Sequence, residues 1–293
     1  MALKACTTCT SSAVAPVGSV VSPCTSAPYT LYHCQTCGSR SFDVHEHEID
    51  LSAFYEGLAA ADPAIADPPF QQTPYWDHEV AVIRRLLGRR PSSVLDVGCQ
   101  AGDFLLHWPA NLSRVGVELS HRWAEVARGR GLSVHQCSLE HLELEEQFDV
   151  VTCYAILEHL IHPRQFLLRL ESLLHQGGLL AVMVPSFQTG KARFLEAIGY
   201  PWHMNRPPEH LNLYSRGFLD DFLGRRGFVV AARRYTSGGM FNPLRRIPGL
   251  GRGFARLMWW MDAYTPLNTL PIFDHMYTYY RKTGTASAPG ASR

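Results

Sequence analysis

The stretch VLDVGCQAGDFL, residues 94–105, decides the fold. Its apolar first half is typical of a buried strand, and two glycines then allow a tight turn into a helix that begins near Asp103. The strand ends in Asp96, two residues before Gly98. A dinucleotide-binding loop would carry G-x-G-x-x-G here, with a phosphate on the helix N-terminus. This sequence does not, and an acid at that place attracts a cation or a hydroxyl group and repels phosphate.

A second acid, Glu118, ends the next apolar stretch, GVEL at residues 116–119. A carboxylate at the end of the second strand suits the two hydroxyl groups of a ribose. Acids at the ends of two neighbouring strands, without a phosphate loop, fit a nucleoside that carries a positive charge. These residues therefore predict that the chain binds S-adenosylmethionine.

Strands and helices alternate on both sides of this turn. We expect strands at residues 93–97, 114–119, 132–136, 148–153, 178–184, 228–233 and 275–281. We expect helices at residues 76–90, 103–108, 122–130, 164–175 and 215–226. This alternation predicts an α/β fold: a Rossmann-like, seven-stranded, mostly parallel sheet with helices on both faces.

Four cysteines near the N-terminus form two C-x-x-C pairs, Cys6 with Cys9 and Cys34 with Cys37. Two such knuckles can present four thiolates to one tetrahedral zinc ion, and the residues between them can form a hairpin. Cys24 is then left over. We therefore expect a small zinc-ribbon-like module at residues 1–45 with one structural zinc, and free thiols are the alternative. Because residues 1–10 show no secretory signal, we expect a cytoplasmic protein.

The remaining organisation follows from composition. Residues 46–74 are rich in Ala, Asp and Pro and are expected to be a linker with a short helix at 51–60. Residues 75–236 form the expected core, and residues 275–283 form its last strand. Between them we expect a basic helical insertion or lid at residues 237–274, and after them a disordered tail at residues 284–293.

The charge of the region near that insertion is unusual. Residues 222–261 contain eight arginines and no acidic residue, and apolar residues at helical spacing over 250–261 predict an amphipathic helix. One interpretation is a lid or docking helix with solvated arginines on its outer face. The other is a basic contact through residues 245–261 with an anionic membrane, or a clamp for a phosphorylated acceptor. A membrane-peripheral location is therefore an alternative.

Five stretches together make the chain similar to the class I S-adenosylmethionine-dependent methyltransferases of the broad bacterial group that modifies small molecules. They are VLDVGCQAGDFL (94–105), GVEL (116–119), FDVVTCYAILEHLIHP (148–163), GGLLAVMVP (177–185) and PPEHLNLYSRGFLDDFLGRRGF (207–228). The resemblance implies a cofactor site at Asp96, Gly98, Gln100, Gly102, Glu118, Leu119, Ser138, Leu139, Tyr154 and Ala155. Gln100 departs from the family because it replaces the middle glycine of G-x-G-x-G. Ser138 departs because it stands where many members place an acid for the adenine amine.

Three residues are candidates for the chemistry. Glu158 and His159 follow the fourth strand, at the edge where open α/β sheets bind ligands. His210 lies in PPEHLN, in the segment that resembles the family's acceptor region. A general base is needed where the attacking group must lose a proton. Alternatively, His159 could fix a loop by a hydrogen bond, and His210 could tie down a proline-rich segment.

The predicted function is methyl transfer from S-adenosylmethionine to a small-molecule, glycan or lipid-linked acceptor. Zinc knuckles ahead of such a core also resemble enzymes that C-methylate nucleotide-bound sugars and some that methylate ribosomal RNA. The net charge is +1 and residues 1–45 contain only Lys4 and Arg40 as basic residues, which disfavours a nucleic-acid partner. The absence of an Asn/Asp-Pro-Pro-Tyr run after the fourth strand disfavours methylation of a base amine. A non-catalytic cofactor-binding protein, whose zinc module binds another protein, is a further alternative.

Overall fold

The computed structural model describes residues 3–44, 50–60, 73–236 and 265–284. Its largest element is a seven-stranded sheet of order β10-β11-β8-β7-β4-β5-β6. The strands are β4 (Ser93–Val97), β5 (Ser113–Glu118), β6 (Ser133–Gln136), β7 (Phe148–Tyr154), β8 (Leu174–Pro185), β10 (Phe228–Thr236) and β11 (His275–Lys282). Strands β6, β5, β4, β7 and β8 are parallel, whereas β11 is antiparallel to both of its neighbours. The predicted fold class and all seven predicted strands are confirmed.

The predicted helices of the core are also present, with small shifts at their ends. They are α3 (Thr73–Leu87), α4 (Asp103–Leu106), α5 (His121–Gly129), α6 (Pro163–Ser172) and α8 (Arg216–Gly224). Helix α6 ends before residue 175, the expected end, because Leu174 already pairs with Phe148 and opens β8. One further helix, α7 (Gly190–Ala197), was not predicted.

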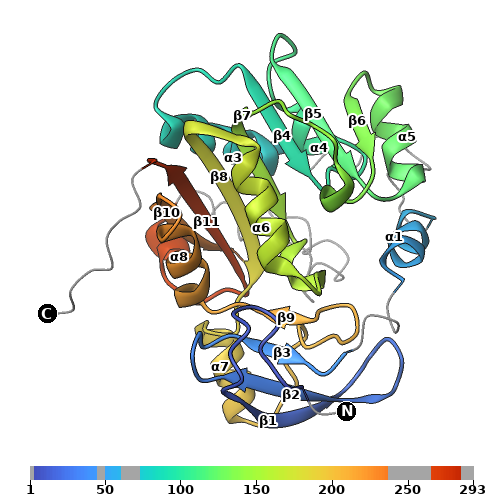
Figure 1. The fold of residues 1–293 in the computed structure, drawn as a ribbon, viewed down its shortest axis with the longest axis vertical. Coiled ribbons are helices and arrows are strands. Elements are labelled where there is room, and N and C mark those ends of the chain that lie inside the picture. Colours follow the sequence, from blue (N-terminus) through green and yellow to red (C-terminus); the bar gives the residue numbers. More distant parts are fainter. Residues whose placement is uncertain (1–2, 45–49, 61–72, 237–264, 285–293) are drawn as a thin grey trace, which may run out of the picture.

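Helices cover both faces of the large sheet, as Figure 1 shows for α6 on the near side. Successive residues of a strand point to opposite faces. Leu95 and Val151 pack with α6 and α8, whereas their neighbours Val94 and Val150 pack with α3 and α4. This double burial explains why the strands are apolar throughout. Because β4 pairs in parallel with β5 and β7, the carboxyl ends of these three strands lie together at one edge of the sheet.

A second sheet of four antiparallel strands, in the order β1-β2-β3-β9, lies at one end of the molecule with α7 (Figure 1). Strands β1 (Val14–Val21) and β2 (Pro28–Cys34) form the hairpin expected between the cysteine pairs, and β3 (Arg40–Phe42) follows. The last strand, β9 (Asn212–Leu213), belongs to the segment between β8 and α8. A strand from the middle of the chain therefore completes the N-terminal sheet.

Side chains reinforce this junction. The carboxamide oxygen of Asn212 accepts hydrogen bonds from Thr7 at 2.5 Å and from Ser41 at 3.0 Å. The hydroxyl of Ser215 donates to the backbone carbonyl of Cys37 at 2.5 Å. The apolar side of the contact consists of Leu31, Phe42, Phe187, Trp202, Met204 and Leu213. The N-terminal sheet and the segment around residues 202–215 thus pack as one unit. The expected division into a module at 1–45 and a core at 75–236 does not include this contact.

Helix α1 (Leu51–Ala60), which was expected within the linker, packs beside the glycine turn. Ala59 is fully buried against Ala101 and Trp123. The backbone N–H of His121 donates a hydrogen bond to the carboxylate of Glu56. The helix therefore covers one side of the turn after β4.

The described part of the basic region contains one buried arginine. Arg234 is 6% exposed and forms an ion pair with the fully buried Glu79 of α3. The other ion pairs of these arginines are Arg225–Asp221, Arg226–Glu171 and Arg233–Asp220. Arg234 is therefore buried in the core, and its acidic partner lies in a distant part of the sequence. The expected helix at 250–261 and the expected membrane contact at 245–261 lie outside the described residues. Within those residues, no helix has both the length and the apolar character needed to cross a membrane.

Candidate active site

The turn after β4 is closely packed on both sides. Gly98 and Gly102 have φ angles of +77° and +84°, in the left-handed region that favours glycine. A Cβ atom on Gly98 would overlap the side chain of Ile156, and one on Gly102 would overlap that of Leu132. Both glycines are therefore required by the backbone and by close neighbours.

Gln100 occupies the place of the family's middle glycine and adopts a left-handed φ of +48°. Such a backbone costs a residue with a side chain roughly 1–2 kcal/mol. The N–H of Gln100 donates to one carboxylate oxygen of Glu118 at 2.8 Å, and the N–H of Ser120 donates to the other at 2.8 Å. The first bond joins the turn to the end of β5 and holds the strained conformation of Gln100, and the second fixes the Glu118 side chain that accepts it.

Asp96 and Glu118 end neighbouring strands and are 5% and 4% exposed. Burial raises the pKa of Asp96 to about 7, although Thr152 donates a hydrogen bond to its carboxylate at 2.6 Å. Burial also raises the pKa of Glu118, against the N–H bonds that favour its ionised form. Two neighbouring buried acids favour a ligand that carries a positive charge or hydroxyl donors. The residues at this turn therefore fit S-adenosylmethionine.

Three other predicted cofactor residues lie at the ends of β5 and β7. Leu119 is half-buried, and Ala155 has a left-handed φ of +54°, a kind of strain that collects at functional sites. Tyr154 is the last residue of β7. Its hydroxyl donates to the buried Glu79 at 2.7 Å and so points towards α3.

Ser138 and Leu139 lie after β6, one strand further along the sheet. The Ser138 hydroxyl is 2.9 Å from Nδ1 of His141. Leu139 is 2% exposed and belongs to the main apolar core. The turn residues and Glu118 thus lie close together, whereas Ser138 and Leu139 lie at the end of the next strand, β6.

The three predicted catalytic residues form one buried cluster. Glu158, His159 and His210 are 1%, 6% and 7% exposed, and one polar atom of each lies within 4.8 Å of the other two. The two imidazole ring centres are 5.0 Å apart, edge to face. The N–H of Leu211 donates to the carbonyl of Glu158 at 2.7 Å, which joins the two segments. Residues from separate parts of the sequence are therefore brought into contact.

Backbone carbonyl groups hold both imidazoles. Nδ1 of His159 donates to the carbonyl of Glu209 at 2.7 Å, and Nδ1 of His210 donates to that of Met204 at 2.8 Å. A carbonyl oxygen only accepts, so the proton of the neutral His210 ring is on Nδ1 and its Nε2 keeps a lone pair, whereas the His159 ring also has a backbone hydrogen bond with Ala155. Burial lowers the pKa of each histidine to about 4 and raises the pKa of Glu158 to about 8. The cluster is therefore uncharged near neutral pH and offers two basic nitrogens.

Helix α1 supplies aromatic side chains that the sequence analysis missed. The rings of Phe54 and Tyr55 lie 6.4 and 6.0 Å from that of His159. Burial, followed by the charges of Glu158 and Glu118, raises the pKa of Tyr55. The signal available in the sequence was this adjacent aromatic pair in a segment otherwise typical of a linker.

The four N-terminal cysteines also come together. The Sγ atoms of Cys6 and Cys37 are 3.7 Å apart, and those of Cys9 and Cys34 are 3.5 Å apart. These separations exceed a disulfide bond of about 2.05 Å. They approach the spacing of about 3.8 Å that four sulfurs adopt around zinc with bonds of about 2.3 Å. The cluster therefore permits a tetrahedral metal ion.

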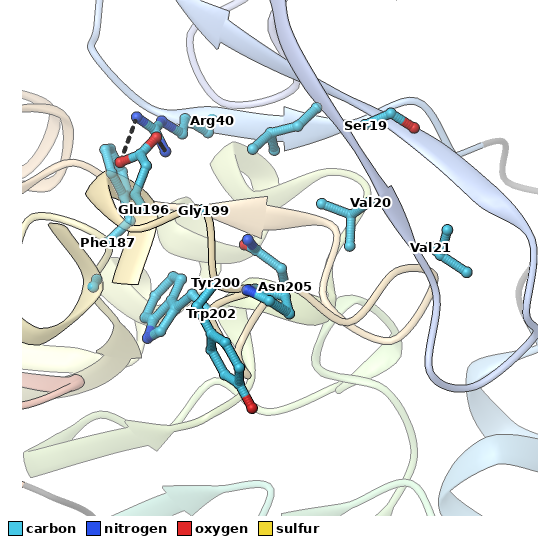
Figure 2. A pocket seen from close by; sticks show the side chains of 13 residues that line it. Ser19, Val20, Val21, Arg40, Phe187, Glu196, Gly199, Tyr200, Trp202 and Asn205 are labelled. Carbon is cyan, nitrogen blue, oxygen red and sulfur yellow. Dashed lines mark hydrogen bonds and ion pairs between the residues drawn. The ribbon is translucent and has the colours of Figure 1, made fainter. Parts of the chain in front are cut away.

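A cavity of about 370 Å³ lies between the N-terminal sheet and α7 (Figure 2). Val20 and Trp202 are among its apolar walls, and Arg40 forms an ion pair with Glu196 at 3.0 Å on its lining. The predicted site residues do not line this cavity. It is therefore distinct from the cluster of Glu158 and the two histidines.

Sequence comparisons agree with this geometry. A family model described as a methyltransferase domain matches residues 73–232. The ubiquinone biosynthesis O-methyltransferase of Chromobacterium violaceum is 29% identical over 167 residues, which are 54% of this chain and 72% of that protein. The protein with the same name from Marinobacter nauticus is 28% identical over 233 residues, which are 72% of this chain and 92% of that protein.

Solved structures share the fold. The magnesium protoporphyrin IX methyltransferase of Synechocystis has a TM-score of 0.51 at 14% identity, over 79% of this chain and 98% of that chain. The 1,6-didemethyltoxoflavin-N1-methyltransferase of Burkholderia thailandensis has a TM-score of 0.51 at 16% identity, over 86% of this chain and 98% of that chain. At these identities the likeness supports the fold alone. The family match covers more than half of the chain and includes both the glycine turn and the cluster. The chain belongs to the methyltransferase domain family and is an S-adenosylmethionine-dependent methyltransferase.

Proposed function

We propose that the protein methylates a hydroxyl group of a small-molecule acceptor. One observation carries this proposal: the buried acids of the turn and the Glu158–His159–His210 cluster occupy the same edge of the sheet, at the carboxyl ends of β4, β5 and β7. Open α/β sheets bind their ligands at this edge. Helix α1 contacts both groups, because Ala59 packs against Ala101 of the turn and the ring of Tyr55 lies 6.0 Å from that of His159, so a donor at one and an acceptor at the other would be neighbours.

The donor side consists of residues from four strand ends. S-adenosylmethionine supplies an electrophilic methyl group on a positively charged sulfur. We assign its positively charged part to Asp96 and its ribose hydroxyl groups to Glu118. We expect the ligand to approach the backbone closely at Gly98, Gln100 and Gly102. The proposed remaining lining is Leu119, Ser138, Leu139, Tyr154 and Ala155.

The acceptor side is the cluster. A hydroxyl oxygen that forms a new bond to carbon must lose its proton, and much of the remaining rate comes from placing the two reactants in line. We assign the acceptance of that proton to His159 or His210, whose pKa burial lowers to about 4 in the free protein, and Glu158 lies beside them. The names of the two relatives support a hydroxyl as the attacking group. A glycan or a lipid-linked molecule with a free hydroxyl would meet the same requirement.

We further propose that Cys6, Cys9, Cys34 and Cys37 hold one structural zinc ion. Residues 1–45, completed by β9, then form a module that braces the segment carrying His210. Elemental analysis of purified Cys34→Ser should show the loss of about one equivalent of zinc. The exposed Cys24, replaced in Cys24→Ser, is the matched control and should leave the zinc content unchanged. Full zinc content in Cys34→Ser would contradict the assignment.

The function is tested by incubating the purified protein with S-adenosylmethionine and a metabolite extract. Mass spectrometry should detect a product heavier than its precursor by one methylene group. His210→Ala should lower its formation roughly 10²–10⁴-fold with unchanged cofactor affinity. His175→Ala, at an exposed position of β8, is the control. Loss of cofactor binding in folded His210→Ala would place this residue on the wrong side of the reaction.

The cofactor site is tested separately by calorimetry. Glu118→Ala should weaken S-adenosylmethionine binding by about 2 kcal/mol, because it removes a charged hydrogen-bond acceptor. Glu125→Ala, at a residue whose side chain is 59% exposed and pairs with Arg128 of the same helix, controls for charge. Unchanged affinity in Glu118→Ala would show that the site lies elsewhere.

A further inference from the structure

We infer that Glu158, His159 and His210 form a binding site for a divalent transition-metal ion. The inference rests on the proposed function only in its last step, where the ion would meet the hydroxyl of the acceptor. The site itself is argued from the cluster alone. It is distinct in donors and in position from the four cysteines.

The cluster offers two imidazole nitrogens and one carboxylate oxygen. Two histidines and one glutamate are a ligand set of catalytic zinc sites, in which a further position stays open. The three potential ligand atoms lie within 4.8 Å of one another. Ligands of a tetrahedral ion with bonds of about 2.0–2.1 Å are separated by roughly 3.4 Å. Small side-chain rotations would therefore close the site around an ion.

The orientation of the two rings is typical of metal-binding histidines. Such residues usually donate the ring N–H that faces away from the metal to a carbonyl or a carboxylate. His159 and His210 both do this, through their Nδ1 atoms, to backbone carbonyl groups. The Nδ1 proton of each ring is therefore held before any ion binds, and the His159 ring would have to give up its second backbone hydrogen bond, with Ala155, to bind an ion.

The carboxyl group of Glu158 supplies an independent reason. Its Oε2 atom is buried and has no hydrogen-bond partner among the described residues. A buried polar atom left in this state usually has an unobserved partner, such as an ion or a water molecule. A histidine pair that only braced the loop would not require an unpaired carboxyl oxygen beside it. An ion bound between the three side chains would account for their closeness, for the orientation of the two rings and for the unpaired Oε2 atom of Glu158.

The open position of such an ion suits the proposed reaction. A hydroxyl group bound to a divalent metal ion loses its proton more readily, and the proton passes to water. The oxygen electron pair then forms the new bond to the methyl carbon, while the bond from that carbon to sulfur breaks and its electrons remain on sulfur. The products are the methyl ether and S-adenosylhomocysteine. Neither imidazole has to accept the proton in this sequence.

The test uses the full chain after removal of metal with a chelator, and titrates it with Co²⁺ while recording its absorption spectrum. Thiolate-bound cobalt gives intense charge-transfer bands, whereas cobalt on nitrogen and oxygen ligands gives only the weaker d–d bands. We expect about two equivalents of Co²⁺ for the wild-type chain. Glu158→Gln and His210→Gln should bind the second equivalent at least about 100-fold more weakly and keep the thiolate bands. His175→Gln, at an exposed position, should bind both.

Each outcome decides a separate point. One equivalent in the wild-type chain, accompanied only by thiolate bands, would overturn the inference without reliance on a variant. Two equivalents bound with wild-type affinity by both cluster variants would also overturn the inference. S-adenosylmethionine calorimetry on the same samples shows whether the variants are folded. Methyl transfer by a protein with one equivalent would leave the proposed function standing. A second equivalent in a protein that methylates no acceptor would refute the function and not the metal site.

Discussion

S-adenosylmethionine should bind more tightly as the pH rises from about 6 to about 8, because Asp96 must be ionised to hold a positively charged ligand. The pKa of this buried carboxyl is raised to about 7. Its ionised fraction therefore grows from about one tenth at pH 6 to about nine tenths at pH 8. If only the ionised form binds, the association constant rises about tenfold, which equals about 1.4 kcal/mol. In the absence of ligand the sign is opposite: burial of this acid destabilises the fold as the pH rises towards 7.

The assay is isothermal titration calorimetry at several pH values on wild-type protein and on Asp96→Asn. The variant should bind more weakly at pH 8 and should lose most of the tenfold dependence on pH. Because the amino group of the ligand titrates in the same way with both proteins, the difference between the two curves isolates Asp96. Repeating the titration in buffers of different ionisation enthalpy should show proton release on binding only for the wild type. Parallel curves for the two proteins would refute the assignment of the ligand cation to Asp96.

Three further substitutions test the backbone and the junction. Gly102→Ala should lower the free energy of unfolding by about 1–3 kcal/mol more than Gly131→Ala, because both glycines are left-handed but only the first has Leu132 in the way; equal losses in urea denaturation would contradict the close packing. Gln100→Gly should raise the same quantity by about 0.5 kcal/mol, because relief of the left-handed strain exceeds the entropic cost of glycine, and a lower urea midpoint would argue against strain. Asn212→Ala should reduce methyl transfer and increase proteolysis of the N-terminal sheet, because it removes hydrogen bonds to that sheet and to the loop after β7; unchanged rates of both would show that the junction does not support the site.

The large sheet and the cofactor turn were predictable because their signals are local. The apolar run of β4, the glycines after it and the acid at the end of β5 lie within 25 consecutive residues, 94–118. The pairing of β9 could not be predicted in the same way, because a strand of two residues has no periodicity. The ion pair of Arg234 with Glu79 was hidden for a related reason, since composition describes a neighbourhood in sequence and not in space.

The candidate catalytic residues occupy an intermediate position. Sequence reasoning placed His159 at the end of a strand and His210 in a later segment, but it could not show that their rings touch. That contact depends on the backbone hydrogen bond from Leu211 to Glu158. Tyr55 was overlooked because the composition around it favours a linker. Tertiary packing, rather than local propensity, decides each of these features.

The two-residue strand β9 has a consequence for synthesis on the ribosome. The strands before it can pair as soon as they emerge, but the outer edge of β3 has to wait for Asn212, which is 171 positions after Ser41. An open strand edge can pair with the edges of other chains, and nascent chains emerge N-terminus first. Until residue 212 has emerged from the ribosome, the outer edge of β3 is therefore open to pairing with other chains unless a chaperone covers it. Chains that stop before residue 212 should aggregate through their first strands, whereas completed chains close that edge themselves.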